Sequence, residues 1–359
     1  MTALPAAAPS SVRRGSRIGG SLALAMTLAL AAAGLFAPEV VLHGWLIAFV
    51  SLAGLGLGSV AWLAIHALTG GRWGDVARPT LLRAAVALPV AAVLALPVIV
   101  ADRWLYPWAS RPDAAGAGVA ALYLNTGGMA VRSLVLLGGL SLVGWRARTG
   151  PLGRLVAALG LLLYGSLMSL AAYDWLLSLE PRYTSSAFGM QIIVAQLLSA
   201  LCLVTLAADA PRDDPVWGDY GSLLLAVLLG ESYIILMTLV VHWYGNLPDQ
   251  AAWYLVRSRG GWRWFEVAAT LLGAVGPGIG LLFGRIRHSP PALRVVAVAV
   301  LAGLLAQNVW LVAPRLGPDA GWAILAGVAA LVACGGLMLV VALQFGPATT
   351  PHGVQHDER

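Results

Sequence analysis

Long apolar runs alternate with short polar connections along the whole chain. Ten runs of about twenty residues stand out, and a helix of that length crosses a hydrocarbon core of about 30 Å. They cover residues 18–36, 42–68, 82–100, 120–143, 155–179, 186–207, 221–243, 264–283, 292–312 and 321–344. The strands of a membrane barrel would show segments of about ten residues with alternating polarity, and the sequence has none. The pattern predicts an all-α polytopic membrane protein with about ten transmembrane helices.

The composition supports this class. Of the 359 residues, 59% are hydrophobic and only 11% are charged, which is too little polar surface for a soluble protein of this size. No polar stretch is long enough to enclose a second core. We therefore expect a single membrane domain over 18–344, between an N-terminal tail at 1–17 and a C-terminal tail at 345–359. Cys202 and Cys334 lie within apolar runs, where core packing is the simplest role.

The arginines predict the orientation. All 22 basic residues are arginine, and most lie in the connections between apolar runs. With the N-terminus inside, fourteen fall on the cytoplasmic side, namely Arg13, Arg14, Arg17, Arg72, Arg78, Arg83, Arg146, Arg148, Arg154, Arg212, Arg285, Arg287, Arg294 and Arg359. Seven fall outside, namely Arg103, Arg111, Arg182, Arg257, Arg259, Arg263 and Arg315. This asymmetry places both termini in the cytoplasm and explains the net charge of +6 without any nucleic-acid partner.

Two features run against the simplest topology. The N-terminal arginines are also compatible with a twin-arginine signal peptide, but no small-residue cleavage site follows the first apolar run, which favours a cytoplasmic tail. On the outer side, three arginines cluster within 257–263. Such a cluster suggests a docking surface for an acidic partner, although a tolerated loop would look the same.

One acidic side chain is expected at mid-membrane. Glu231 lies near the centre of the span at 221–243, and Thr238 and His242 follow seven and eleven residues later. This spacing places all three on one helix face, as a polar stripe from mid-membrane to the outer surface. An intramembrane carboxylate is a functional-site hypothesis by default, here a proton path or the wall of a ligand cavity. The alternative is a buried carboxylate kept for packing, either paired with an arginine or protonated.

A second acidic side chain ends the span at 155–179. Ser169, Tyr173 and Asp174 form a polar sequence towards the outer end of that helix, and we expect them to belong to the proton path, with Arg132 setting the pKa values of its acidic groups. The charge of Asp174 needs compensation, and Arg132, inside the preceding span, is the obvious candidate. The depth of Arg132 in the membrane, counted in residues from the end of its span, allows it to pair with either Asp174 or Glu231. Both pairings therefore stay open. We count the four amides at 191, 196, 307 and 308 as interhelical hydrogen-bonding groups.

Bound redox centres find little support in the sequence. A membrane haem needs two histidines at matching depth on facing helices, and only His43 and His242 form such a pair, near the outer surface. There is no cysteine cluster for iron–sulfur ligation and no metal-ligating motif. We therefore predict no metal and no covalently bound cofactor.

Two long motifs carry a family resemblance. DWLLSLEPRYTSSAFG at 174–189 and HWYGNLPDQAAWYLVR at 242–257, with YLNTGGMAVRSL at 123–134, resemble the signature segments of a membrane component of alternative complex III. That complex is a bacterial quinol:electron-acceptor oxidoreductase. The segments are similar to those of its smaller polysulfide-reductase-type membrane protein, often called the second quinone-binding subunit. The resemblance extends to the number and order of the spans.

The resemblance implies two four-helix bundles flanked by peripheral helices in a bacterial cytoplasmic membrane. It implies no redox cofactor in this chain, a possible quinone or quinol ligand, and a role in quinone binding or proton translocation. The implied partners are a paralogous quinol-binding membrane subunit, iron–sulfur subunits and multihaem cytochrome c subunits. Motif positions are occupied by Arg132, Asp174, Glu180, Arg182, Asn246, Asp249 and Arg257. We expect the last five of these to contact partners on the outer side.

The sequence also departs from the family pattern. It has Met237 and Thr238 where a Ser-Gln pair is usual, Gln250 where a second acidic residue is usual, and His242 where an apolar residue is usual. The proton-handling groups are therefore rearranged, or the chain is a diverged paralogue. Two other functions remain open: a stand-alone ion-coupled secondary transporter, for which Pro277 among glycines is a weak sign, and a purely structural anchoring subunit.

Overall fold

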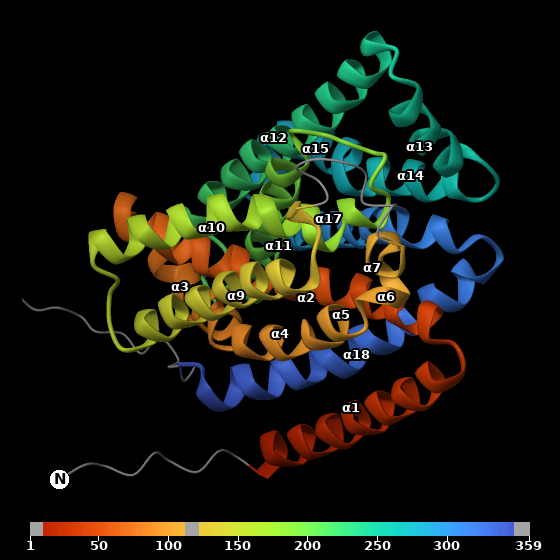
Figure 1. Cartoon of the computed structure of the whole chain (residues 1–359). Coiled ribbons are helices and arrows are strands. Elements are labelled where there is room, and N and C mark those ends of the chain that lie inside the picture. The colour runs from red at the N-terminus through yellow and green to blue at the C-terminus, as the bar shows by residue number, and fades with distance from the viewer. Residues whose placement is uncertain (1–9, 112–121, 348–359) are drawn as a thin grey trace, which may run out of the picture.

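The computed structural model describes residues 10–111 and 122–347, and every regular element within them is a helix (Figure 1). The helices are α1 (Ser10–Phe36), α2 (Pro38–Thr69), α3 (Arg72–Val86), α4 (Leu88–Leu94), α5 (Leu96–Val100), α6 (Asp102–Leu105), α7 (Pro107–Ser110), α9 (Thr126–Arg148), α10 (Arg154–Trp175), η2 (Leu177–Leu179), α11 (Phe188–Ala207), α12 (Val216–Gly245), α13 (Pro248–Ser258), α14 (Trp262–Thr270), η3 (Leu271–Val275), α15 (Gly276–Leu282), α16 (Gly284–Arg287), α17 (Pro290–Val312), η4 (Ala313–Asp319) and α18 (Ala320–Phe345).

Eight helical runs in the described residues are long and apolar enough to cross a membrane. The last run, Pro290–Phe345, contains two of the predicted spans, because α17 and α18 are joined by η4, where Gly317 has a φ of 56°. The eight runs thus account for nine of the ten predicted spans. The remaining predicted span, at 18–36, lies in α1, within which the fully described residues give the apolar stretch Ala25–Phe36. The chain is a multi-pass membrane protein.

Several predicted boundaries are wrong. Helix α1 begins at Ser10, so part of the predicted tail at 1–17 is helical, while residues 1–9 and 348–359 lie outside the described part. The span predicted at 82–100 begins ten residues earlier, at Arg72, and is interrupted at Ala87 and Ala95. Pro89 and Pro97 cause these interruptions, since proline has no N–H to donate and crowds the preceding turn.

The start of α9 also differs from prediction, and the neighbouring connections contain short helices. Helix α9 begins at Thr126 instead of 120 because Asn125 caps it, its side-chain oxygen accepting a hydrogen bond from the Gly128 N–H at 2.6 Å. The short helices α6 and α7 lie between the spans predicted at 82–100 and 120–143, where residues 112–121 are outside the described part. Helix α13 lies within the connection 244–263.

Helix α2 lies at the centre of the bundle. It is apolar on all sides and is the most buried of the spans. Its glycines allow neighbouring helices to approach closely: a Cβ added at Gly44 would meet the Ala323 carbonyl oxygen at 2.5 Å, and one added at Gly58 would overlap the Gln196 carbonyl oxygen. Helices α18 and α11 therefore pack directly against the α2 backbone.

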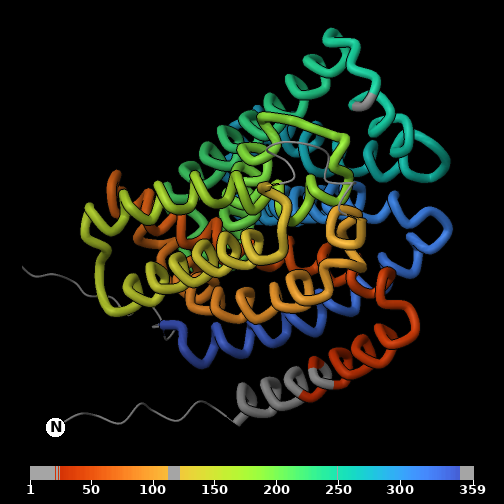
Figure 2. The backbone as a smooth tube through the Cα atoms, in the orientation of Figure 1, coloured from red at the N-terminus to blue at the C-terminus, as the bar shows by residue number. Residues whose placement is uncertain are grey.

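The remaining helices surround α2 in two groups. Helices α3, α4, α9 and α10 pack on α2 and on one another, while α11, α12, α15 and α17 form a second set of mutual contacts. Helix α1 lies at the edge, against α18 and α2 (Figure 1). The connections α2–α3 and α9–α10 lie at one end of the bundle, at the left of Figures 1 and 2, and the connections α1–α2 and α17–α18 lie at the other. These connections therefore lie at two opposite ends of the bundle.

Candidate functional site

The structure resolves which acid pairs with Arg132. The guanidinium donates two hydrogen bonds to Asp174, Nε to Oδ2 at 2.7 Å and Nη2 to Oδ1 at 2.8 Å. It also lies 3.9 Å from the ring centroid of Tyr123 and donates to the Tyr123 carbonyl oxygen. The Asp174 side chain is only 1% exposed. Arg132, near the N-terminus of α9, and Asp174, near the C-terminus of α10, thus form a bidentate ion pair, and Glu231 is not part of it.

The other polar groups on α10 are occupied by local hydrogen bonds. The Ser169 hydroxyl donates to the Gly165 carbonyl oxygen, and a Cβ added at Gly189 would lie 2.7 Å from the Ser169 Cα. Ser169 is therefore a small residue at the contact between α10 and α11. The Tyr173 hydroxyl donates to the Ser185 carbonyl oxygen at 2.5 Å. Both predicted path residues thus stabilise the helix packing around Asp174.

A polar group that the sequence analysis did not select lies beside this ion pair. Asp102 on α6 is buried and accepts a hydrogen bond from the Thr126 hydroxyl. The Tyr106 hydroxyl donates to the Trp175 carbonyl oxygen at 3.1 Å, and burial raises the pKa of Tyr106 well above its usual value, with Asp174 and Asp102 adding to the shift. The only sequence signal was the position of Asp102 just after an apolar run.

Glu231 stands apart from every ion pair among the described residues. Its side chain is 3% exposed, and neither carboxylate oxygen has a hydrogen-bond partner in that part of the chain. The polar group that interacts with the Glu231 carboxylate is the side-chain amide of Gln307 on α17, but the two groups do not meet the geometry of a hydrogen bond. Thr238 and His242 are buried on the same face of α12, as the spacing predicted. Burying a carboxylate without a hydrogen-bond partner lowers the stability of the fold. The presence of Glu231 at this position therefore needs an explanation.

The stripe on α12 ends in an aromatic cluster. His242 Nδ1 lies 3.5 Å from the Tyr254 hydroxyl, which lies 3.4 Å from the Tyr183 hydroxyl. Tyr183 stacks on Trp253 with a centroid distance of 4.1 Å, and burial raises the pKa values of Tyr183 and Tyr254. The connection after α10 and helix α13, which carry parts of the two long motifs, thus meet at the C-terminal end of α12.

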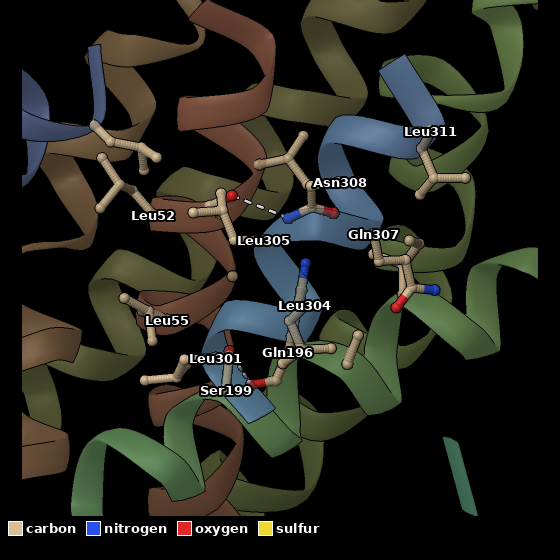
Figure 3. A pocket seen from close by; sticks show the side chains of 16 residues that line it. Leu52, Leu55, Gln196, Ser199, Leu301, Leu304, Leu305, Gln307, Asn308 and Leu311 are labelled. Carbon is tan, nitrogen blue, oxygen red and sulfur yellow. Dashed lines mark hydrogen bonds between the residues drawn. The ribbon is translucent and has the colours of Figure 1, made fainter. Parts of the chain in front are cut away.

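A cavity of about 150 Å³ lies between α2, α11 and α17 (Figure 3). Its wall is mostly apolar, with leucine the commonest residue, and its polar groups are Ser51, Gln196, Ser199, Gln307 and Asn308. The Asn308 amide donates to the Ser51 hydroxyl at 2.9 Å, and the Gln196 side-chain oxygen accepts from Tyr164. Three of the four amides selected from the sequence thus line one cavity. Gln307 connects this cavity to Glu231.

Arg257 was predicted to belong to an outer docking surface, and for this residue the prediction is wrong. Arg257 is 1% exposed, and its Nη2 donates to Glu180 at 2.5 Å and to the Leu311 carbonyl oxygen at 3.0 Å. Its Nε donates to the Trp310 carbonyl oxygen, and the guanidinium lies 3.8 Å from the Trp253 ring centroid. Burial lowers the pKa of Arg257, and Glu180 opposes that shift. Arg257 joins α13 to the ends of α10 and α17 because α13 folds back over the bundle.

The other predicted outer residues have different roles. Arg182 is exposed, as are Arg259 and Arg263, so these three side chains stay available to partners. Asn246 ends α12 in the left-handed conformation, with φ 46° and ψ 47°, which is a structural role. Asp249 lies in the first turn of α13, and its side chain is outside the described part. Glu180 is half-buried and holds Arg257.

The described residues contain no group of three or more His, Cys, Asp or Glu side chains that could hold a metal ion. His43 is buried in α2, with Nδ1 bonded to the Glu39 carbonyl oxygen, and its Nε2 has no partner in the described part of the chain. A comparison of the sequence with models of protein families finds no match, and a comparison with curated proteins finds none either.

Proposed function

We propose that this chain is an integral membrane subunit of a quinol-oxidising respiratory complex of the alternative complex III type, and that Glu231 carries protons in it. Ten transmembrane helices with both termini in the cytoplasm, in a bacterial cytoplasmic membrane, belong to the same proposal. The observation that carries the proton role is the Glu231 carboxylate, which is buried without a hydrogen-bond partner in the described residues. A carboxylate that must gain and release a proton cannot be held in a permanent ion pair.

The surroundings of Glu231 support this role. Towards the outer surface, the same face of α12 carries Thr238 and His242, and His242 lies near the hydroxyls of Tyr254 and Tyr183. Glu231 and His242 are eleven residues apart, about 16 Å along the helix. Proton transfer over that distance requires intervening water. Towards the bundle centre, Gln307 links Glu231 to the cavity.

The contacts between the two long motifs support membership in such a complex. Residues 174–189 and 242–257 are far apart in the sequence, yet they meet through the Glu180–Arg257 ion pair and the Tyr183–Trp253 stack. Motifs that hold each other in place at one end of the bundle create a defined outer surface for partner subunits. The least buried span, Trp262–Leu282, offers a face for a neighbouring membrane subunit.

Under this proposal Asp174 and Arg132 do not carry protons. Their two short hydrogen bonds and the 1% exposure of Asp174 favour a fixed ion pair that holds α9 against α10. Electron transfer takes place in partner iron–sulfur and multihaem cytochrome c subunits, while this chain contributes the proton path and a possible quinone contact.

Two experiments test the proposal. Purification from bacterial membranes in mild detergent should recover this chain together with haem and iron–sulfur proteins. In vesicles containing that complex, Glu231→Gln should lower the number of protons released per quinol oxidised, whereas Glu39→Gln at the start of α2 should leave it unchanged. Wild-type stoichiometry in the Glu231 variant would rule out the proton role while leaving complex membership intact.

A secondary transporter is the second candidate, and the interrupted helix α14–η3–α15 favours it. Gly276 donates its N–H to the Leu271 carbonyl oxygen five residues earlier, which makes a π-helical turn just before Pro277. Such turns and broken helices are frequent at the binding sites of transporters. A transporter would purify without haem proteins and would catalyse ion-dependent solute uptake in vesicles made from this chain alone.

A further inference from the structure

The arginines at the predicted cytoplasmic end fall into two classes. Some are used by the fold: Arg72 pairs with Asp214 at 2.6 Å, Arg83 donates to the Pro347 carbonyl oxygen, and Arg294 donates to that of Ala208. Others have no acidic partner among the described residues. This division separates arginines that hold the bundle together from arginines that are available to a ligand.

Three of the available arginines gather at the turn between α9 and α10. Arg146, Arg148 and Arg154 are all exposed, lie within nine residues of one another, and take part in no ion pair of the described chain. Arg146 donates only to the neutral hydroxyl of Thr149. The turn lies at one end of the bundle, at the left of Figures 1 and 2.

A fourth positive charge lies beside this turn, on Arg78. Arg78 on α3 donates to the carbonyl oxygens of Ala147 and Gly150, which fixes the turn and satisfies the end of α9. The acidic residue nearest to it on α3 is Asp75, one turn earlier, whose carboxylate lies 3.5 Å from His66. The turn is therefore fixed by hydrogen bonds and positively charged, and no acidic side chain in the described part of the chain pairs with its three exposed arginines.

An aromatic side chain locates the turn at the membrane surface. Trp145 is 46% exposed, and the Arg148 guanidinium lies 4.8 Å from its ring centroid. Tryptophan is enriched at the level of the lipid headgroups, where one side of the ring is apolar and the other is hydrated. Arginine binds phosphate through a planar fork of donors, and arginine clusters beside a membrane helix attract anionic lipids.

We propose that Arg146, Arg148 and Arg154 bind the phosphate headgroup of an anionic phospholipid, with Trp145 packed against its glycerol and acyl region. The occupant is a lipid and not a soluble phosphate because Trp145 requires an apolar contact on the bilayer side of the charges. The site is independent of Glu231 and of the proposed respiratory role.

The test compares two triple variants of the full-length protein purified from membranes in mild detergent. Arg146, Arg148 and Arg154 are changed to Gln in one variant. In the matched control, the exposed outer residues Arg182, Arg259 and Arg263 are changed to Gln, which removes the same charge. Mass spectrometry measures the phosphatidylglycerol retained per protein, and thermal unfolding is followed as phosphatidylglycerol is added back.

The wild type and the outer control should retain phosphatidylglycerol and gain thermal stability when it is added, and phosphatidylcholine should have no such effect. The inner variant should bind phosphatidylglycerol about tenfold to hundredfold more weakly, since each arginine near an anionic surface contributes to the attraction. Equal retention by both triple variants, equal effects of the two lipids, or full competition by millimolar inorganic phosphate would overturn the proposal.

Two further sets of variants separate charge from folding. Replacing the same three inner arginines by Lys preserves the charge and should preserve the part of the lipid selectivity that depends on charge alone, while the part that depends on the planar guanidinium is lost. The three single Gln variants should each lose part of the selectivity. If the single variants fold like the wild type and bind phosphatidylglycerol as tightly, the proposal fails even where the triple variant does not fold.

Discussion

Arg132 and Asp174 face each other across the α9–α10 contact as a bidentate ion pair, with hydrogen bonds of 2.7 and 2.8 Å. Because Asp174 is 1% exposed, removing either partner leaves the other charge buried without compensation. We expect Asp174→Asn and Arg132→Gln each to lower the free energy of unfolding by about 3–5 kcal/mol. The double variant should cost less than the sum of the two. Additive losses in a double-mutant cycle would show that the pair is not coupled.

Glu231 and Glu180 should respond to neutralisation in opposite ways. Glu231→Gln removes a carboxylate that has no partner in the described chain, so thermal stability should stay the same or rise. Glu180→Gln removes the anion beside buried Arg257 and should destabilise the protein by about 2 kcal/mol or more. Thermal unfolding in detergent checks both. A large loss of stability in the Glu231 variant would indicate a structural partner and would argue against the proton role.

Gly303 should tolerate no larger side chain. A Cβ at this position would overlap the Cα and N atoms of Gly273, so α17 and the π-helical turn η3 would have to separate. We expect Gly303→Ala to destabilise the protein and to disturb the α14–α15 span. Gly165→Ala is the matched control, because a Cβ there meets nothing within 4 Å on the same kind of helix. It should be neutral, or stabilising by up to about 1 kcal/mol. Similar stabilities for the two variants would contradict the close helix contact.

Buried tyrosine should make the fold sensitive to alkali. Burial raises the pKa of Tyr106 well above the unfolded value of 10.0. Below pH 10 both states hold the proton, so this group adds no pH dependence. Above it the unfolded chain loses the proton first, and stability falls as pH rises towards the folded pKa.

Tyr106→Phe tests this directly. The variant should lose about 1 kcal/mol at neutral pH, with the hydrogen bond to the Trp175 carbonyl oxygen, but its stability should fall less steeply above pH 10. Unfolding midpoints measured from pH 7 to 11 give the dependence of stability on pH for the wild type and for the variant. Parallel curves for the wild type and the variant would mean that Tyr106 does not contribute to the alkaline transition.

The sequence predicted what depends on apolar length and helical spacing. The spans follow from the cost of burying polar backbone in lipid, and the face shared by Glu231, Thr238 and His242 follows from the helix period. For Arg132 the sequence left two possible acidic partners, Asp174 and Glu231. The depth of a residue in the membrane can be counted from the sequence, but which helices lie next to each other cannot be read from it. Which acid faces Arg132 depends on the rotation of α9 against α10.

Tertiary folding decided what the sequence could not. Arg257 lies in a polar connection, which predicted exposure, but α13 turns back and buries it against α10 and α17. The amides Gln196, Gln307 and Asn308 each looked like isolated helix contacts, and only the packing of α11 and α17 on α2 collects them around one cavity. Asn125 shifted the start of α9 by a side-chain cap that hydropathy alone does not detect.

The central position of α2 has a consequence for biosynthesis. Helix α2 is made early, yet its closest neighbours include α11, which is made well after it, and α18, which is the last helix of the described chain. Until then its glycine-rich faces are in contact with lipid or the insertion machinery. The nascent bundle can therefore close only after the final hairpin enters the bilayer, and truncation within α18 should leave a membrane-inserted but protease-sensitive chain.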